Sequence, residues 1–328
     1  MSKHKHSIKN LDAQYLEKIK KVEFTPIFIL GLHRSGTSIL YKMLTETQEF
    51  NPVTAYHIIN YDQLLYNSIK NKENKAKKEL TKYLQSQGQK NRVIDKLKIT
   101  ADFAEEYGFL LRKYSSKYYI TKNNVAKFIE LGKKIQFISK NNKPLLLKNP
   151  YDLPNFPYIK STFPTAKFIF IHRHPYRSIS SLVKAVKLIL KTRNSYTSLL
   201  FRDYNTAFEN PLLLHSYRLA FSKYLPFGTI LLSNMAARNL KKYMKNINQI
   251  PKKDYINLTY ETLCEKPQET MQNILEFLEI KNIRIDFSTY IKPRKIRTDQ
   301  SVINIKSFIY KNSKSYFNLF NYDKDFFL

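Results

Sequence analysis

A glycine turn between an apolar strand and a helix is the feature that most constrains the fold of this chain. Residues 26–44 read PIFILGLHRSGTSILYKML. Pro26–Leu30 has the apolar character of a buried parallel strand, and apolar residues return at helical spacing over Ser38–Thr45. A strand that turns into a helix in this way presents free backbone N–H groups and the positive end of the helix dipole. The turn is therefore predicted to bind an anion.

The turn differs from a nucleotide-binding phosphate loop at one position. Gly31 and Gly36 have the spacing of such a loop, but Thr37 stands where its lysine would be. Arg34 lies inside the turn instead, and a planar guanidinium can hold a phosphate-like group through two hydrogen bonds. Thr37 and Ser38 can still donate hydrogen bonds. These residues predict a site for a phosphate-like group and no metal.

A later strand and helix predict a second anion site. Ala166–His172 is an apolar run, and Tyr176–Leu190 has the character of a helix. Arg173 leaves the end of the strand, and Ser181 lies eight residues later on the helix, where Arg177 could assist. Two anion pockets on neighbouring strands imply a ligand with two phosphate-like groups.

Strands that alternate with helices predict an open parallel sheet. Pro144–Lys148 and Asp254–Leu258 are further predicted strands, and Leu212–Met244 is predicted to be mostly helical. The predicted organisation is a polar N-terminal arm over 1–24, a single domain over 25–310 and an aromatic C-terminal tail over 311–328. Within the domain, residues 67–143 are rich in Lys, Asn and Gln and are predicted to form surface helices of an insertion around the acceptor.

The composition favours an anionic ligand but does not indicate which class of ligand it is. The chain of 328 residues carries 56 Lys and Arg against 26 Asp and Glu, a net charge of +30. This excess favours an anionic small molecule, nucleic acid or a membrane surface, although an A/T-rich coding sequence would also produce it. The basic residues are spread along the chain, so no specific nucleic acid is expected. Cys264 is the only cysteine, and no signal peptide or membrane span is recognisable, so we expect a soluble, cytoplasmic protein.

Four segments together resemble one known family, the PAPS-dependent sulfotransferases, where PAPS is 3′-phosphoadenosine-5′-phosphosulfate. FILGLHRSGTSIL and FIFIHRHPYRSISSLV resemble the two cofactor loops of the family. LLLKNPYDLPNFPYIKSTFPTAKFIFIHRHP resembles its Lys-x-Pro strand and Phe-Pro-x-Ala, and INLTYETLCEKPQETMQNILEFLEI resembles its late Tyr-Glu-x-Leu pattern. His174 departs from the family, which often has an acidic residue there, and residues 46–143 and 285–328 show no resemblance.

The resemblance implies a fold and a reaction. The fold would be an α/β three-layer sandwich like that of the P-loop NTPases, with a central parallel sheet flanked by helices. The reaction would move the sulfuryl group from PAPS to a hydroxyl or amine acceptor by in-line displacement, without a metal, and leave adenosine 3′,5′-bisphosphate. Residues implied to hold the phosphosulfate are Arg34, Ser35, Gly36, Thr37 and Ser38. Arg173 and Ser181 would hold the 3′-phosphate, and Tyr260 would lie near the adenine or pack in the core.

Three residues are predicted to act in catalysis. Arg34 would stabilise charge on the transferring group, and Lys148 would neutralise the bridging oxygen as it leaves. An exposed lysine at a strand end would look the same. His57 would be the base that activates the acceptor, because an imidazole titrates near neutral pH. The fallbacks are Glu46, Glu49, Asp62 and His215.

Two other classes of protein remain open at this point. A nucleotide kinase or other phosphate-loop NTPase would share the first loop, but Thr37 in place of lysine argues against it. A non-catalytic polyanion binder would explain the charge but not the two ordered loops. Lys292–Ser301, a basic stretch, could close over the cofactor or form a solvated charge run. The acceptor could be a carbohydrate, a lipid, a small phenol or a peptide tyrosine.

Overall fold

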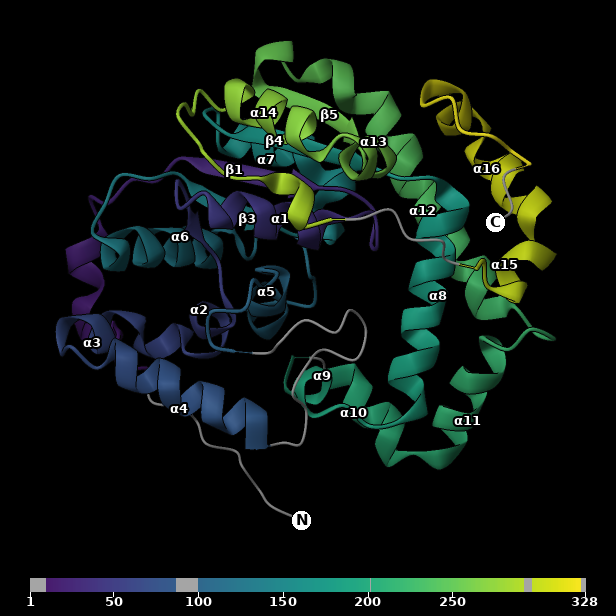
Figure 1. Ribbon diagram of the computed structural model, residues 1–328. Helices are drawn as coiled ribbons and strands as arrows, with labels where there is room; N and C mark the ends of the chain where they lie inside the picture. Colours follow the sequence, from purple (N-terminus) through teal and green to yellow (C-terminus); the bar gives the residue numbers. More distant parts are fainter. Residues whose placement is uncertain (1–9, 87–99, 201, 292–296, 326–328) are drawn as a thin grey trace.

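A parallel sheet of five strands forms the centre of the molecule (Figure 1). The computed structural model describes residues 10–86, 100–200, 202–291 and 297–325. Every pair of neighbouring strands is parallel, in the order β2-β3-β1-β4-β5. The strands are β1 (Pro26–Leu30), β2 (Asn51–Pro52), β3 (Leu145–Lys148), β4 (Lys167–His172) and β5 (Tyr255–Thr259). The predicted α/β class and parallel sheet are confirmed.

Helices cover both faces of the sheet. The helices are α1 (Thr37–Glu46), α2 (Ala55–Ile59), α3 (Leu64–Ile69), α4 (Glu73–Ser86), α5 (Gly108–Tyr114), α6 (Val125–Ser139), α7 (Phe156–Thr162), α8 (Pro175–Lys191), α9 (Ser195–Leu200), α10 (Arg202–Glu209), α11 (Pro211–Ala220), α12 (Phe227–Asn246), α13 (Tyr260–Glu265), α14 (Pro267–Phe277), α15 (Gln300–Asn304) and α16 (Lys306–Leu319). The 3-10 turns are Ala13–Ile19, Tyr61–Gln63, Pro150–Asn155, Ile247–Gln249, Lys252–Asp254 and Phe287–Thr289.

The alternation of side chains along the strands divides the core into two layers. In β1, Phe28 packs into one cluster with residues of α6, α7 and α12, while Ile27 and Ile29 pack into another with residues of α1, α13 and α14. All three side chains are at most 3% exposed. Both faces of the strands are therefore apolar, which is the pattern of a parallel sheet covered on each side by helices.

Because the strands are parallel, the carboxyl ends of β1, β3, β4 and β5 lie at the same edge of the sheet. β1 lies in the middle, with β3 on one side and β4 on the other, so the chain reverses its direction of winding across β1. Ligands of open α/β sheets bind outside the carboxyl ends of the strands at such a point. The glycine turn follows β1, Lys148 ends β3, and Arg173 follows β4. Tyr260 follows β5.

The segment 67–143 contributes to the core as well as to the surface. It was predicted as surface helices, and α4 fits that description, with only Leu80 and Leu84 buried. For α6 the prediction is wrong, because Phe128, Leu131 and Ile135 are buried in the cluster that packs on the sheet. This apolar stripe is difficult to recognise in the sequence of 67–143, because polar residues occupy the outer face of the same helix.

The described residues nearest the two ends of the chain also pack on the domain. The predicted boundary between residues 310 and 311 is wrong, because it cuts α16, which is a continuous helix with Tyr316 and Phe317 buried. In Figure 1, α16 lies beside α12 and α8, and the three helices are in contact. The described part of the predicted arm, residues 10–24, forms a 3-10 turn, and Asp12 pairs with buried Lys134 at 3.0 Å.

No helix of the described ranges combines the length and the apolar character that a bilayer crossing needs.

Candidate functional site

The glycine turn has a backbone that few residues can adopt. Gly36 caps α1 with a φ of 106°, in the left-handed region, and Arg34 has a φ of 68°. A Cβ atom at residue 36 would lie 2.4 Å from Cδ2 of Tyr260. Glycine at this position therefore serves two purposes, since it permits the turn and lets the aromatic ring approach the start of the helix. α1 then begins at Thr37 with its N–H groups directed toward the turn.

Contacts between the first and second loops bring the two predicted anion pockets together. Nε of Arg34 donates to Oγ of Ser181 at 3.2 Å, across 147 residues of sequence. Nη1 of Arg173 donates to the carbonyl oxygen of Arg34 at 2.7 Å. The cation of each pocket thus contacts a residue of the other, and the two pockets form one continuous basic surface at the end of β1 and β4.

Arg173 is buried and contacts Tyr260 and Arg34, but one of its hydrogen-bond donors has no partner. Its guanidinium lies 4.1 Å from the ring centre of Tyr260, a cation–π contact, and the residue is only 7% exposed. Burial lowers its pKa, although an arginine remains charged in proteins. Nε of Arg173 and Oγ of Ser35 are both buried without a hydrogen-bond partner. Buried donors of this kind are normally satisfied, so they suit an anionic ligand with several oxygens.

Lys148 lies between the glycine turn and a carboxylate that the sequence reading did not identify. Its ammonium group donates to Oγ of Ser38 at 3.2 Å and pairs with Glu106 at 3.3 Å. Lys148 is 1% exposed, so the alternative of an ordinary exposed strand-end lysine is wrong. Glu106 comes from the segment without resemblance. The only signal for it in the sequence is a pair of adjacent carboxylates, Glu105 and Glu106, in the segment 100–111, which contains no Lys or Arg.

Aromatic rings line the site beside this ion pair. His33, in the glycine turn, packs edge-to-face on Tyr151 with ring centres 4.5 Å apart. Tyr118 stacks on the same tyrosine at 4.8 Å. Burial lowers the pKa of His33; Glu106 opposes this shift, while Lys148 adds to it. His33 is therefore neutral at pH 7, and the arrangement combines a base, a cation and a flat apolar wall.

His57 does not join these residues, and its prediction as the catalytic base is not supported by the geometry. It is the third residue of α2, and its Nδ1 accepts a hydrogen bond from the N–H of Thr54 at 3.1 Å, which closes a capping box. Burial, together with the charge of Lys77, lowers its pKa to about 3. Nδ1 is therefore occupied by the backbone and the ring is hard to protonate, so we propose helix capping as the role of His57.

The fallback bases also lie apart from the cluster around Lys148. Asp62 pairs with Lys113 at 2.8 Å, and His215 is exposed on α11. Glu46 ends α1, at the opposite end of that helix from the turn, and Glu49 follows it. Residues 292–296, which belong to the basic stretch predicted to close over the cofactor, lie outside the described residues.

His174, the departure from the family pattern, has a structural explanation. Its backbone N–H donates to Glu261 at 3.2 Å, and its Nε2 contacts the carbonyl of Asp323 at 2.8 Å. Tyr322 also donates to Glu261, at 3.3 Å. The segment that follows α16 therefore packs against the residue after Arg173, and Glu261 joins the two through its hydrogen bonds with His174 and Tyr322.

Comparisons with known proteins identify a family through a family model and a fold through solved structures. A model described as the sulfotransferase family matches residues 26–283. Among solved structures, sulfotransferase STF9 from Mycobacterium avium is 14% identical with a TM-score of 0.59, and the match covers 95% of this chain and 80% of that one. Sulfotransferase STF1 from Mycobacterium tuberculosis H37Rv is 14% identical with a TM-score of 0.54, covering 92% and 79%. No curated protein sequence matches. At this identity the two structures bear on the fold alone.

Proposed function

The chain belongs to the sulfotransferase family, and on that premise we propose that it transfers the sulfuryl group of PAPS to a hydroxyl or amine acceptor. The observation that carries the choice of donor is the pair of linked anion pockets, in which Arg34 contacts Ser181 and Arg173 contacts Arg34. A donor with a phosphosulfate and a separate 3′-phosphate requires two such pockets side by side. ATP, the ligand of a kinase, has no 3′-phosphate and would leave the second pocket without a function.

The residues divide naturally between the two ends of such a donor. The N–H groups at the start of α1 and the buried hydroxyl of Ser35 would hold the phosphosulfate, together with Arg34. The free Nε of Arg173 and the hydroxyl of Ser181 would hold the 3′-phosphate. Tyr260 lies against Arg173 and would position its guanidinium. The same ring would also contact the adenine. When bound, PAPS supplies an activated sulfur with a phosphate leaving group.

Lys148 and Glu106 would act on different atoms of the transfer, the leaving oxygen and the acceptor proton. In the proposed step, the acceptor oxygen forms a bond to sulfur, the bond from sulfur to the bridging phosphate oxygen breaks, and the acceptor proton goes to a base. Lys148, beside Ser38, is placed to neutralise the leaving oxygen. Glu106, 3.3 Å from Lys148, is the carboxylate we propose as the base in place of His57.

The wall formed by His33, Tyr151 and Tyr118 would bind the acceptor. Flat aromatic faces pack well on a ring, such as a phenol or the apolar face of a sugar, and the ring does not need to be charged. We therefore propose a ring-bearing acceptor.

Calorimetry with the desulfonated product tests the proposal. The protein should bind adenosine 3′,5′-bisphosphate more tightly than AMP, because one extra phosphate meets Arg173 and Ser181. Charge-assisted hydrogen bonds contribute about 1.5–3 kcal/mol, so the preference should be roughly ten- to hundredfold. Arg173→Ala should abolish the preference and Arg34→Ala should weaken both ligands. Arg193→Ala, a change at a surface arginine, should alter neither affinity.

Equal affinity for the two ligands would remove the reason for a second pocket. Preferential binding of ATP with magnesium, together with a requirement for the metal, would favour the phosphate-loop kinase instead. Binding of any polyanion that weakens uniformly with salt, without preference for the bisphosphate, would favour the polyanion binder.

A further inference from the structure

A second surface, remote from the glycine turn in sequence, exposes large apolar side chains. In the described part of the chain, eight of the twelve exposed large hydrophobic residues fall between residues 212 and 235. We call them the α11–α12 surface: Leu212, Tyr217, Leu219, Tyr224, Leu225, Phe227, Leu231 and Met235. Leu212 is 81% exposed and Phe227 is 67% exposed. Such a concentration of apolar side chains marks an interaction site rather than ordinary surface.

The geometry of α12 places the apolar side chains on one stripe. At 100° per residue, Phe227, Leu231 and Met235 lie within about 80° of one another on the outer side of the helix. Arg238 and Lys242, also exposed, continue the same stripe toward the C-terminal end. The opposite side of α12, with Ala237, Leu240 and Tyr243, is buried. The outer stripe is thus apolar in its first half and basic in its second.

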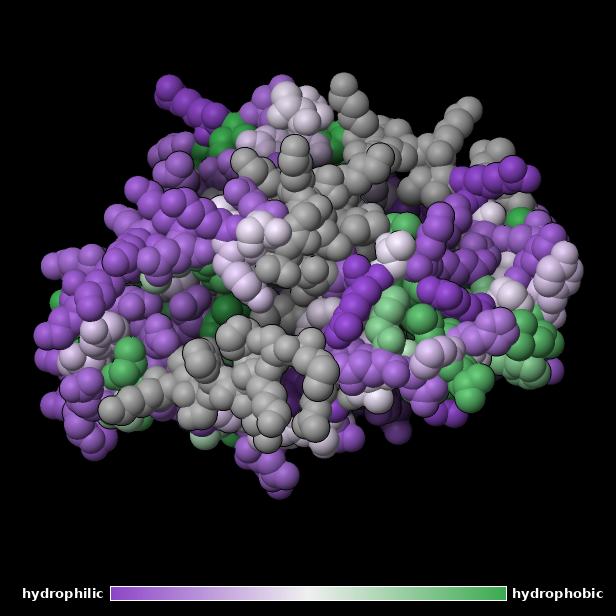
Figure 2. Space-filling model, turned by 90° about the horizontal axis from the view of Figure 1, so that it is seen from below, coloured by the Kyte–Doolittle hydropathy of each residue, from purple (hydrophilic) through white to green (hydrophobic). Residues whose placement is uncertain are grey.

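The chain segment that forms this surface carries charge of one sign. Residues 210–253 contain no Asp or Glu, and they contain eight basic residues: Arg218, Lys223, Arg238, Lys241, Lys242, Lys245, Lys252 and Lys253. Figure 2 shows hydrophobic side chains gathered toward the right of the molecule, the side on which α11 lies in Figure 1, with hydrophilic side chains around them. The partner must therefore offer both an apolar phase and negative charge.

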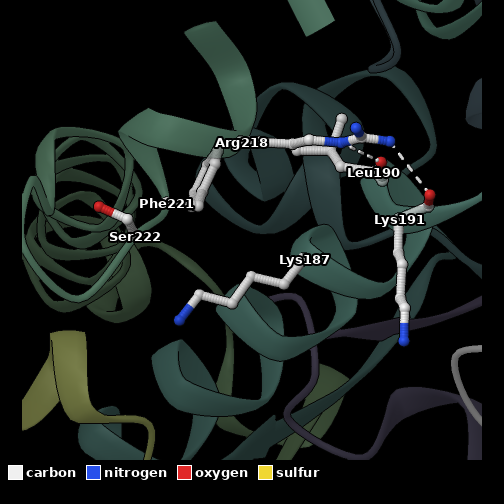
Figure 3. Close-up of a pocket in the computed structure, with 6 residues that line it drawn as sticks. All are labelled: Lys187, Leu190, Lys191, Arg218, Phe221 and Ser222. Atoms are coloured by element: carbon white, nitrogen blue, oxygen red, sulfur yellow. Dashed lines mark hydrogen bonds between the residues drawn. The ribbon is translucent and has the colours of Figure 1, made fainter. Parts of the chain in front are cut away.

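A basic pocket lies next to the α11–α12 surface. It has a volume of about 440 Å³ and is lined by Lys187, Leu190, Lys191, Arg218, Phe221 and Ser222 (Figure 3). Arg218 donates from Nε and Nη2 to the carbonyls of Leu190 and Lys191, at 2.9 and 3.1 Å, and so caps the end of α8. Lys187 pairs with Asp299 at 2.8 Å, whereas Lys191 is exposed. Lys191 and Arg218 therefore give the pocket a positive charge.

From these observations we propose that the α11–α12 surface docks on an anionic phospholipid bilayer. Apolar side chains would enter the interface between headgroups and acyl chains, and the basic residues would contact the lipid phosphates. A second copy of the chain fits less well, because a symmetric contact would bring basic residues together without an acidic partner. The proposal is independent of the sulfuryl-transfer reaction, and it is tested without measuring activity.

The chain contains no tryptophan, which makes a clean probe possible. Phe227→Trp would introduce the only one, on the proposed contact. Its emission should shift to the blue with vesicles of phosphatidylcholine and phosphatidylglycerol, and much less with phosphatidylcholine alone. Tyr83→Trp, at a 51% exposed position on α4, is the matched control and should not shift.

Vesicle co-sedimentation then separates apolar from electrostatic binding. Leu212→Asp with Leu231→Asp should reduce binding at least tenfold. Arg238→Ser with Lys242→Ser removes two charges from the surface and should reduce binding roughly 25-fold, since each basic residue near an anionic membrane contributes about fivefold. Lys78→Ser with Lys82→Ser removes the same charge from α4 and should have a small effect.

Three results would overturn the proposal. The first is no binding to anionic vesicles by the intact protein. The second is an equal loss of binding in the α4 and α12 charge variants, which would mean that the net charge alone is responsible. The third is a dimer in light scattering that Leu212→Asp converts to a monomer while vesicle binding is unchanged, which would assign the surface to a second copy of the chain.

Discussion

Replacing His57 by glutamine separates a capping role from a catalytic one. Glutamine at the third position of a helix can accept the same hydrogen bond from the N–H of Thr54 that Nδ1 of His57 accepts at 3.1 Å. The variant should therefore keep α2 and keep turnover near the wild-type value at pH 7. What it loses is a titratable group, and the loss should be visible as a change in the pH dependence of stability.

The size of the change follows from the pKa. His57 titrates near 6.5 when unfolded and at about 3 when folded, because burial disfavours the charged ring. Above pH 6.5 the ring is neutral in both states, and its burial does not lower the free energy of unfolding. Below pH 6.5 the free energy of unfolding falls with the pH, because the unfolded chain binds a proton that the folded chain does not. Between pH 7 and pH 5 the loss is about 2 kcal/mol, at about 1.4 kcal/mol for each pH unit below 6.5. His172, whose pKa is also lowered to about 3, contributes a similar loss in both proteins.

The measurement is urea unfolding at pH 7 and pH 5, followed by circular dichroism. Wild type should lose about 2 kcal/mol more than His57→Gln between the two pH values. His215→Gln, which changes an exposed histidine, is the control and should behave as wild type. Identical pH dependence in wild type and His57→Gln would refute the burial argument. A hundredfold fall in turnover for the folded variant would instead return His57 to the catalytic machinery.

The remaining predictions concern the reaction. Lys148→Ala should lower the turnover number by about 10²–10³ with every acceptor and leave bisphosphate affinity comparatively intact, and an equal loss of affinity in calorimetry would make the lysine a binding residue. Glu106→Gln should lower the turnover number by about 10²–10⁴, most for acceptors of high pKa, and should remove the acidic limb of the pH–rate profile. If His33→Asn produces that effect and Glu106→Gln does not, the base is His33. Activity should survive excess EDTA, and its restoration by magnesium after chelation would contradict the metal-free mechanism.

The sequence alone was sufficient for four of the five strands and for the turns that follow β1 and β4, whereas the two-residue strand β2 (Asn51–Pro52) was not predicted. Pro26–Leu30 and the glycine turn are local features, since burial on both faces requires a continuous apolar run and the turn requires glycine. Arg173 and Ser181 could be assigned to one pocket because a strand end and the helix after it are joined by a short connection. Family membership followed from the order of these same short segments.

Only the tertiary structure brought Glu106 to Lys148 and showed that His57 closes a capping box at the start of α2. Glu106 is 42 residues from Lys148 in sequence, and no local pattern indicates which of two adjacent carboxylates faces the ion-pairing partner. His57 looked catalytic because its residue type titrates near neutral pH, but its surroundings, which local sequence does not reveal, lower that pKa to about 3. Strands and turns are encoded by neighbours along the chain, whereas the chemistry of a side chain depends on the distant residues that pack around it.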